Sequence, residues 1–147
     1  MRTGRAFAIA GAAVASAVGV AAAPASAAPA DHDRGLRPVT NVLQPVDPYD
    51  SQWVSIRWTT DRKVCHVRVR VHAGRDVDVD YPSDRTFTSF ARGENLKPGR
   101  VDYTSFRVKV GQGPGWQFLR ATVDYDTCRW NSPTMNDAIG LWLPVRA

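Results

Sequence analysis

Residues 65–81 read CHVRVRVHAGRDVDVDY, and apolar and polar side chains alternate along this segment on both sides of Ala73-Gly74-Arg75. A period of two is typical of a β-strand that buries one face and exposes the other. The valines of both halves are therefore expected to face a core, while the Arg, His and Asp side chains face solvent. The segment predicts two strands in succession.

We expect these two strands to form a hairpin over the three-residue break. In that register Arg70 lies opposite Asp78 and Arg68 lies opposite Asp80, so that a basic strand neutralises an acidic strand. Opposite charges paired across strands stabilise a sheet by roughly 0.2–1 kcal/mol per pair. The charged residues of this segment are therefore interpreted first as a structural ladder.

Two functional interpretations of the same residues compete with the structural one. The basic stripe from His66 to His72 would suit an anion, and the stripe of Asp76, Asp78 and Asp80, with Asp84 beyond it, would suit calcium. Calcium, however, needs about six to eight oxygen atoms that converge at about 2.4 Å. Carboxylates on alternate residues of a strand lie roughly 6–7 Å apart along a line. A metal site is therefore not predicted.

The remainder of the chain shows the same period in short stretches. Val54, Ile56 and Trp58 share one face of a predicted strand, and Trp53 lies on the other face. No window carries a 3.6-residue stripe, and a composition of 13 Asp, one Glu, 10 Pro and 11 Gly disfavours helices. Short strands at this spacing predict an all-β sandwich or a small antiparallel barrel. Further strands are expected at residues 39–46, 86–90, 103–110, 118–125 and 139–145.

The first 27 residues predict a secretory signal peptide that is cleaved from the mature protein. Arg2 and Arg5 precede an uncharged, Ala-rich run over residues 6–23, and Ala25-Ser26-Ala27 fits the small-residue cleavage rule. An uncleaved membrane helix is the alternative interpretation, but Ala and Gly would give such a helix little transfer energy. The protein is therefore predicted to be secreted, with no membrane contact after cleavage.

The mature chain is predicted to be only weakly basic. Removing residues 1–27 leaves 17 basic and 14 acidic residues, a net charge of +3. So small a surplus in an exported protein argues against nucleic acid as a partner. Arg outnumbers Lys by 16 to 3, as is common in GC-rich bacteria. Residues 28–36 are expected to form a flexible lead, and residues 37–147 a single domain.

Cys65 and Cys128 are expected to form a disulfide, because an exported protein folds in an oxidising compartment. Two widely spaced cysteines in an exported all-β domain resemble the pattern of the immunoglobulin-like sandwich. The chain departs from that pattern because no Trp follows Cys65 closely, and because Tyr125 stands three residues before Cys128 where the family has two. The resemblance implies an immunoglobulin-like β-sandwich closed by Cys65–Cys128, and fold alone implies no function.

Tryptophan is unusually frequent, with five residues in the chain. Trp58 is expected in the core. We predict that Trp53, Trp116 and Trp130 are partly exposed and bind a ligand, because rigid aromatic side chains are common binding anchors. The competing interpretation is that these three side chains plug the open ends of a small sandwich.

Catalytic and cofactor motifs are absent from the sequence, including a nucleophile elbow, HExxH, a Walker loop and GxGxxG. His32, His66 and His72 stand at no recognised spacing from a nucleophile. We therefore predict a non-catalytic binding module without cofactor or metal, whose ligand is a cell-surface polysaccharide or a protein. The alternative is an inhibitor of a secreted enzyme that inserts the surface loop Gly111–Gly115 into its target. A small hydrolase that uses paired carboxylates is the third candidate.

Overall fold

The computed structural model describes residues 35–147, in which every regular element except one short turn is a strand. A 3-10 turn, η1 (Pro82–Asp84), follows the fourth strand, and no helix in the described range could cross a membrane. The predicted signal peptide and residues 28–34 of the predicted lead lie outside the described residues. The all-β prediction is confirmed. The strands are β1 (Leu36–Pro38), β2 (Ser51–Thr60), β3 (Val64–His72), β4 (Val77–Asp80), β5 (Asn95–Leu96), β6 (Asp102–Val110), β7 (Gly115–Asp126) and β8 (Met135–Val145).

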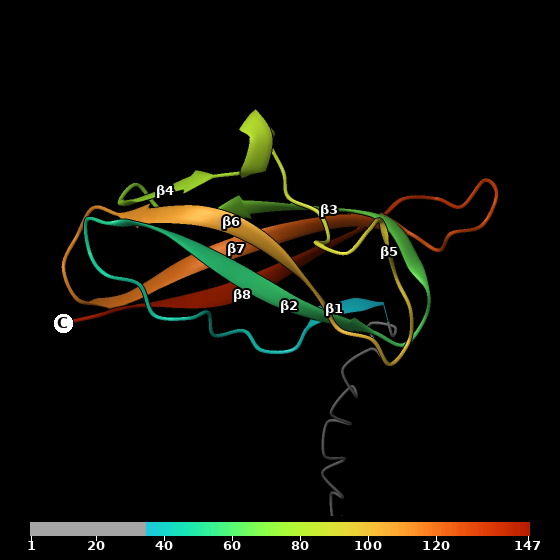
Figure 1. Ribbon diagram of the computed structural model, residues 1–147, viewed down its shortest axis with the longest axis horizontal. Coiled ribbons are helices and arrows are strands. Elements are labelled where there is room, and N and C mark those ends of the chain that lie inside the picture. Colours follow the sequence, from blue (N-terminus) through green and yellow to red (C-terminus); the bar gives the residue numbers. More distant parts are fainter. Residues whose placement is uncertain (1–34) are drawn as a thin grey trace, which may run out of the picture. The chain divides into compact units, whose positions relative to one another are not determined.

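These strands form two antiparallel sheets, which we call sheet A and sheet B (Figure 1). Sheet A has the order β1-β2-β6-β4, and sheet B has the order β5-β3-β7-β8. In sheet B, β7 and β8 pair along their length, and the loop between them projects at the end opposite the C-terminus (Figure 1). Two separate sheets make the fold an immunoglobulin-like sandwich rather than a barrel.

The core lies between the inward faces of the two sheets, as the period of two predicts. Val67, Val69 and Val71 of β3 are at most 5% exposed. Trp58 of β2 is fully buried, and its indole N–H donates a hydrogen bond to Thr104 Oγ1 at 2.8 Å. The predictions for the buried strand faces and for Trp58 are confirmed.

The predicted hairpin between residues 66–72 and 76–81 is wrong. β3 pairs with β5 and β7 in sheet B, whereas β4 pairs with β6 in sheet A. The charged side chains pair accordingly, with Arg70 bound to Asp124 at 2.6 Å and Asp80 bound to Arg107 at 3.0 Å. Both β3 and β4 turn their valines toward the same core, although they lie in different sheets. Two strands paired in one sheet and two strands that face each other across the sandwich therefore have the same alternation of apolar and polar residues.

Most of the other expected strands are present. Residues 39–46 form two isolated parallel bridges, from Val42 to Trp142 and from Val46 to Val145, instead of a continuous strand. Residues 86–90 contribute only a bridge from Thr88 to Val69, and β5 was not predicted. The strands expected at residues 103–110, 118–125 and 139–145 are confirmed as parts of β6, β7 and β8.

The chain between β1 and β2 covers part of the outer edge of β8. The Trp142 N–H donates to the Asn41 carbonyl at 2.7 Å, and the Leu43 N–H donates to the Trp142 carbonyl at 2.8 Å. The same ladder continues to Val46, which accepts from the Arg146 N–H at 2.9 Å. We call residues 41–46 the covering segment. It bonds to β8 only from Trp142 onward.

The predicted disulfide between Cys65 and Cys128 is present, with the two Cα atoms 5.1 Å apart. Both cysteines belong to sheet B and its margin, so the bond joins β3 to the chain after β7. Strict alternation would have turned Cys128 to the wrong face, but β7 ends at Asp126 and Cys128 adopts a left-handed φ of 62°. On the other side, a β-bulge begins after Cys65 and includes His66, whose φ is 53°.

Candidate functional site

The three tryptophans predicted to bind a ligand lie on different surfaces. Trp53 is 53% exposed on the outer face of sheet A, and Trp116 is 61% exposed near the start of β7. Trp130 is 98% exposed in the loop beyond the other end of β7. Because a strand rises about 3.3 Å per residue, roughly 30 Å of β7 lies between Trp116 and Trp130. The structure therefore does not bring the three side chains together.

Trp116 instead shares its face of sheet B with two aromatic residues that were not predicted to bind a ligand. Phe118 follows it on the same face of β7, and Trp142 lies opposite Phe118 on β8. The Phe118 and Trp142 rings meet edge to face, with centroids 5.2 Å apart and planes inclined at 65°. They are 53% and 46% exposed, and Val42 of the covering segment, 45% exposed, adjoins Trp142. We call Trp116, Phe118, Trp142 and Val42 the aromatic face.

Gly140 provides the space in which the Phe118 ring lies. A Cβ atom at Gly140 would stand 2.9 Å from Phe118 Cε2 and 3.1 Å from Phe118 Cζ. Gly140 lies two residues before Trp142 on β8, opposite Arg120. An aromatic ring that covers a glycine in the neighbouring strand compensates for the packing that the glycine lacks. The glycine thus fixes where Phe118 rests, next to Trp142.

The outer face of sheet B becomes polar beyond Gly140. Asp124 accepts hydrogen bonds from Asn136 Nδ2 at 2.5 Å and from Arg70 Nη1 at 2.6 Å. The hydrogen bond from the Asn136 amide, and then the contact with Arg70, hold the pKa of Asp124 below its ordinary value. We call Arg70, Asp124 and Asn136 the polar cluster. The polar cluster includes Arg70, one of the two arginines of the basic stripe. The guanidinium carbon of the other, Arg68, lies 5.3 Å from the Phe87 ring centroid.

Trp53 has a charged rather than an aromatic environment. The guanidinium carbon of Arg107, its cross-strand partner, lies 5.9 Å from the Trp53 ring centroid. Arg107 also binds Asp80 of β4 at 3.0 Å. A cation over an indole face is worth about 0.5–1 kcal/mol at an exposed site. One face of Trp53 is thus already paired with Arg107.

The loop Gly111–Gly115 lies beside the aromatic face. It joins β6 of sheet A to β7 of sheet B, and Gln112 and Pro114 are exposed. The Gly111 N–H donates to the Asp76 carbonyl at 2.7 Å, which fixes the first residue of the loop. Gly115 has a φ of +149°, which side-chain-bearing residues rarely adopt, so Trp116 enters β7 through a conformation that favours glycine.

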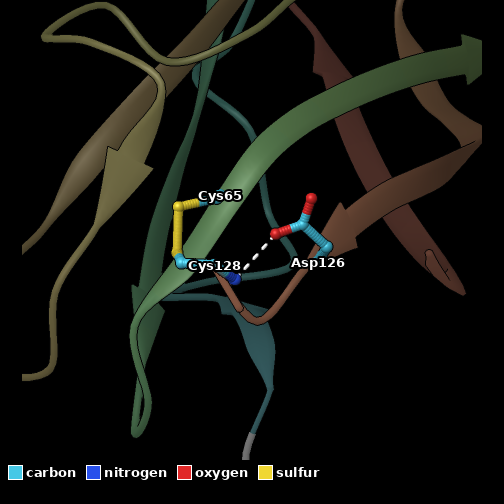
Figure 2. A group of neighbouring side chains, drawn as sticks. All are labelled: Cys65, Asp126 and Cys128. Carbon is cyan, nitrogen blue, oxygen red and sulfur yellow. Dashed lines mark hydrogen bonds between the residues drawn. A yellow bond between two sulfur atoms is a disulfide. The ribbon is translucent and has the colours of Figure 1, made fainter. Parts of the chain in front are cut away.

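One group among the described residues has the composition of a metal site, namely Cys65, Asp126 and Cys128 (Figure 2). The two sulfur atoms are bonded to each other and are therefore not thiolate ligands. Asp126 accepts from the Cys128 N–H at 2.7 Å with one oxygen and contacts His66 Nδ1 at 2.6 Å with the other. These two contacts, the backbone one first, lower the pKa of Asp126. The group is a disulfide with a carboxylate that fastens the adjoining turn.

No family model matches the chain, and no curated protein matches its sequence. Solved structures are similar in fold. The GAE domain of GGA2p from Saccharomyces cerevisiae gives a TM-score of 0.51 at 8% identity, over 76% of this chain and 98% of that one. At this identity the likeness concerns the fold alone, and it agrees with the immunoglobulin-like sandwich described above.

Two further structures resemble the chain more distantly. The secreted serine protease VesC from Vibrio cholerae gives a TM-score of 0.45 at 11% identity, over 78% of this chain and 23% of VesC. The PapD-like domain 7 of human CEP192 gives a TM-score of 0.39 at 10% identity, over 76% of this chain and 83% of that domain. The chain thus spans about a quarter of the length of VesC.

Proposed function

We propose that the mature protein is a secreted, non-catalytic binding module and that it binds a polysaccharide on the aromatic face. The observation that carries the proposal is the gathering of Trp116, Phe118 and Trp142 on one exposed face of sheet B. Phe118 and Trp142 are in contact, and Trp116 and Val42 are exposed on the same face, so the four side chains form an apolar patch of a kind that commonly marks interaction sites. Two strands of a sheet support the patch, so little ordering is needed when a ligand binds.

A sugar polymer suits this patch better than a charged ligand does. The four side chains of the aromatic face carry no charge, and sugar rings stack on aromatic rings through their C–H faces. Phe118 and Trp142 are inclined at 65° to each other, so their surface is stepped rather than planar. A single, twisted polymer chain fits such a surface better than the flat face of a crystalline fibre does. The predicted role of Trp116 is kept in this proposal.

The test is a depletion assay with mature protein, residues 28–147. The protein is incubated with a panel of insoluble polysaccharides and bacterial cell walls, and the unbound fraction is measured at low and high salt. We expect binding that survives high salt, since stacking on aromatic rings is little screened by ions. Trp142→Ala should weaken binding by about 30-fold, the effect of losing roughly 2 kcal/mol at a central anchor.

Trp130→Ala is the matched control, because it removes an equally large and more exposed indole from the other end of β7. We expect it to change binding by less than about twofold. Equal binding by wild type and both variants would contradict the proposal. Binding that disappears at high salt would also contradict it and would redirect attention to the basic stripe of β3.

If no polysaccharide binds, an inhibitor of a secreted enzyme becomes the leading candidate. The loop Gly111–Gly115 supports this second function, because it lies next to Trp116 and exposes Gln112 and Pro114. Assays of common secreted proteases and glycosidases with micromolar protein test it. Inhibition that is lost on Trp116→Ala would favour it, and no response from any enzyme would exclude those enzymes as targets.

A further inference from the structure

A groove opens between the edge strands of the two sheets, away from the aromatic face. It has a volume of about 590 Å³ and lies between β1 of sheet A and the first half of β8 of sheet B. Tyr125 forms part of its lining and is 3% exposed, and Leu36 of β1 is 5% exposed. The apolar residues that line it are Leu36, Pro38, Met135, Ala138 and Ile139. Arg37, Arg62 and Asp137 also line the groove, which thus combines apolar and charged side chains between two sheet edges.

Along this groove, the edge of β8 that faces away from β7 has no backbone partner within the described residues. Trp142 turns both its N–H and its carbonyl toward the covering segment, away from β7. Alternate residues of a strand turn the same way, so Asn136, Ala138 and Gly140 also direct their N–H and carbonyl groups away from β7. The covering segment does not reach them, and no backbone group within residues 35–147 bonds to them on that side. Among residues 35–147, three donors and three acceptors in a row thus have no backbone partner.

We propose that residues 136–140, with the groove beside them, bind an extended peptide segment of a partner protein as an additional strand of sheet B. The ligand is an extended peptide because another extended backbone supplies the acceptors and donors that a row of unpaired N–H and carbonyl groups needs. The covering segment gives a precedent on the same edge, since it is an extended segment that already pairs with the second half of β8. A bound peptide would continue this ladder toward Asn136.

The side chains of β8 permit a peptide strand to bind at this edge. The edge sequence Asn136-Asp137-Ala138-Ile139-Gly140 contains neither Lys nor Pro, the residues that commonly block strand addition. Ala138 and Gly140 present little side chain on the outer face, so a neighbouring strand meets little obstruction there. On the inner side, Ile139 is half-buried and faces the groove. A peptide whose alternate side chains are apolar would place them against Ile139 and Leu36.

Asp137 is the one acidic residue among the charged residues that line the groove, the others being Arg37 and Arg62. Its carboxylate accepts a hydrogen bond from Tyr125 Oη at 2.8 Å. Burial, with the contact to Asp137, raises the pKa of Tyr125 to about 12, so the phenol remains a neutral donor at physiological pH. The remaining acceptor capacity of the carboxylate lies where a peptide side chain would enter. We expect a preference for a Ser, Thr or basic side chain at that one position.

The experiment uses mature protein and a phage-displayed library of random octapeptides, which needs no knowledge of the natural partner. Enriched peptides are synthesised with a fluorescent label, and their dissociation constants are measured by anisotropy. We expect sequences with apolar residues at alternate positions. In the same complex, hydrogen exchange of the Asn136, Ala138 and Gly140 amides should slow at least tenfold, because these amides gain acceptors.

Ala138→Pro is the variant designed to break the added strand. It removes an N–H that points away from β7, so it removes no hydrogen bond of sheet B. Ala138→Ser, the matched control, keeps that N–H. We expect peptide binding at least tenfold weaker for Ala138→Pro and within about twofold of wild type for Ala138→Ser. Should Ala138→Pro fail to fold, the exchange measurement on wild type decides alone.

Several results would overturn the inference. One is a library from which no peptide is enriched, and another is an enriched peptide that binds Ala138→Pro as tightly as wild type. A third is that the three amides are already protected in the free protein. Sedimentation would then show whether a second copy of the chain occupies the edge. Trp116→Ala alters the aromatic face opposite Pro144, outside residues 136–140, so it should weaken polysaccharide binding but leave peptide binding unchanged. Failure of this inference and failure of the polysaccharide proposal are therefore distinguishable.

Discussion

The outer faces of the two sheets both expose tryptophan, but they surround it differently. On sheet A, Trp53 lies among charged side chains, and Arg107 stands between its ring and Asp80. On sheet B, Trp116 lies near Phe118 and Trp142, whose rings contact each other. Exposure of the indole is similar on the two faces, 53% for Trp53 and 61% for Trp116. Neighbouring side chains, rather than exposure, distinguish the two surfaces.

The physical reason lies in the cross-strand partners. A side chain on a sheet face interacts chiefly with the residue opposite it on the next strand. Arg107 is opposite Trp53, whereas an aromatic residue is opposite Phe118. Sheet A thus pairs its exposed indole with a cation, and sheet B gathers its aromatic residues into a patch.

The first prediction concerns the disulfide, which fastens sheet B at the end remote from the aromatic face. Replacing both cysteines, Cys65→Ser with Cys128→Ser, should lower the free energy of unfolding by about 4 kcal/mol, because the bond closes a loop of about 60 residues. Urea unfolding measures the loss, with reduced wild type as the control. We expect the near-ultraviolet circular dichroism of the aromatic face to persist in the folded variant. A loss below about 1 kcal/mol would contradict the prediction.

The second prediction compares the buried and exposed faces of β6. Thr104→Val keeps the shape of the side chain but removes the acceptor of the Trp58 indole N–H, which is fully buried. An unsatisfied buried donor costs about 1–3 kcal/mol, and the midpoint of thermal unfolding should fall accordingly. Ser105→Ala, on the opposite face of β6, is the control and loses only a part-buried hydroxyl contact with Ser55. An equal fall in the unfolding midpoint for the two variants would contradict a stabilising role for the hydrogen bond between Trp58 and Thr104.

The third prediction alters the aromatic face without removing a ring. Gly140→Ala places a methyl group where it would stand 2.9 Å from the Phe118 ring, so the ring must turn away from its present position. We expect a change in the near-ultraviolet circular dichroism, with a change in unfolding free energy below about 1 kcal/mol, since the ring is exposed. Gly113→Ala is the control, because a Cβ there meets nothing within 4 Å. Identical spectra for wild type and Gly140→Ala would contradict the packing described.

The sequence predicted the strand faces well because burial enforces a period of two. Val69 and Val79 were both placed on the inward face, where the structure has Val69 buried and Val79 packed against the core. Alternation contains no information on which strand lies next to which, so the Arg70–Asp78 pair was wrong. Sequence order favoured a local hairpin, whereas the chain crosses from sheet B to sheet A after His72.

The aromatic face could be predicted only in part. Trp116 and Phe118 alternate with the buried Leu119, so their outward direction follows from the period of two. Trp142 alternates with Leu141 and could have been placed outward in the same way. That Phe118 stands opposite Trp142 depends on the register of the β7–β8 hairpin, and an eight-residue connection, residues 127–134, does not fix that register in the sequence.

The smallest expected effect compares one carboxylate on each outer face. The pKa of Asp124 is held below its ordinary value, first by the Asn136 amide and then by Arg70. A carboxylate of this kind contributes stability that is present above its unfolded-state pKa of about 3.9 and is lost as the pH falls through its folded-state pKa. The stability difference between wild type and Asp124→Asn should therefore shrink as the pH falls from about 5 to about 2.

Asp80→Asn is the control on sheet A, because Asp80 forms an exposed ion pair with Arg107 and its side chain is 60% exposed. Exposed pairs contribute about 0.2–1 kcal/mol or nothing measurable, so this variant should change the free energy of unfolding by less than about 1 kcal/mol. Urea unfolding at several pH values measures both variants. A similar pH dependence for the two would mean that the polar cluster is no better organised than the ion pair beside Trp53. A dependence confined to Asp124→Asn would show that the outer face of sheet B is ordered beyond its aromatic rings, which is what a preformed binding surface requires.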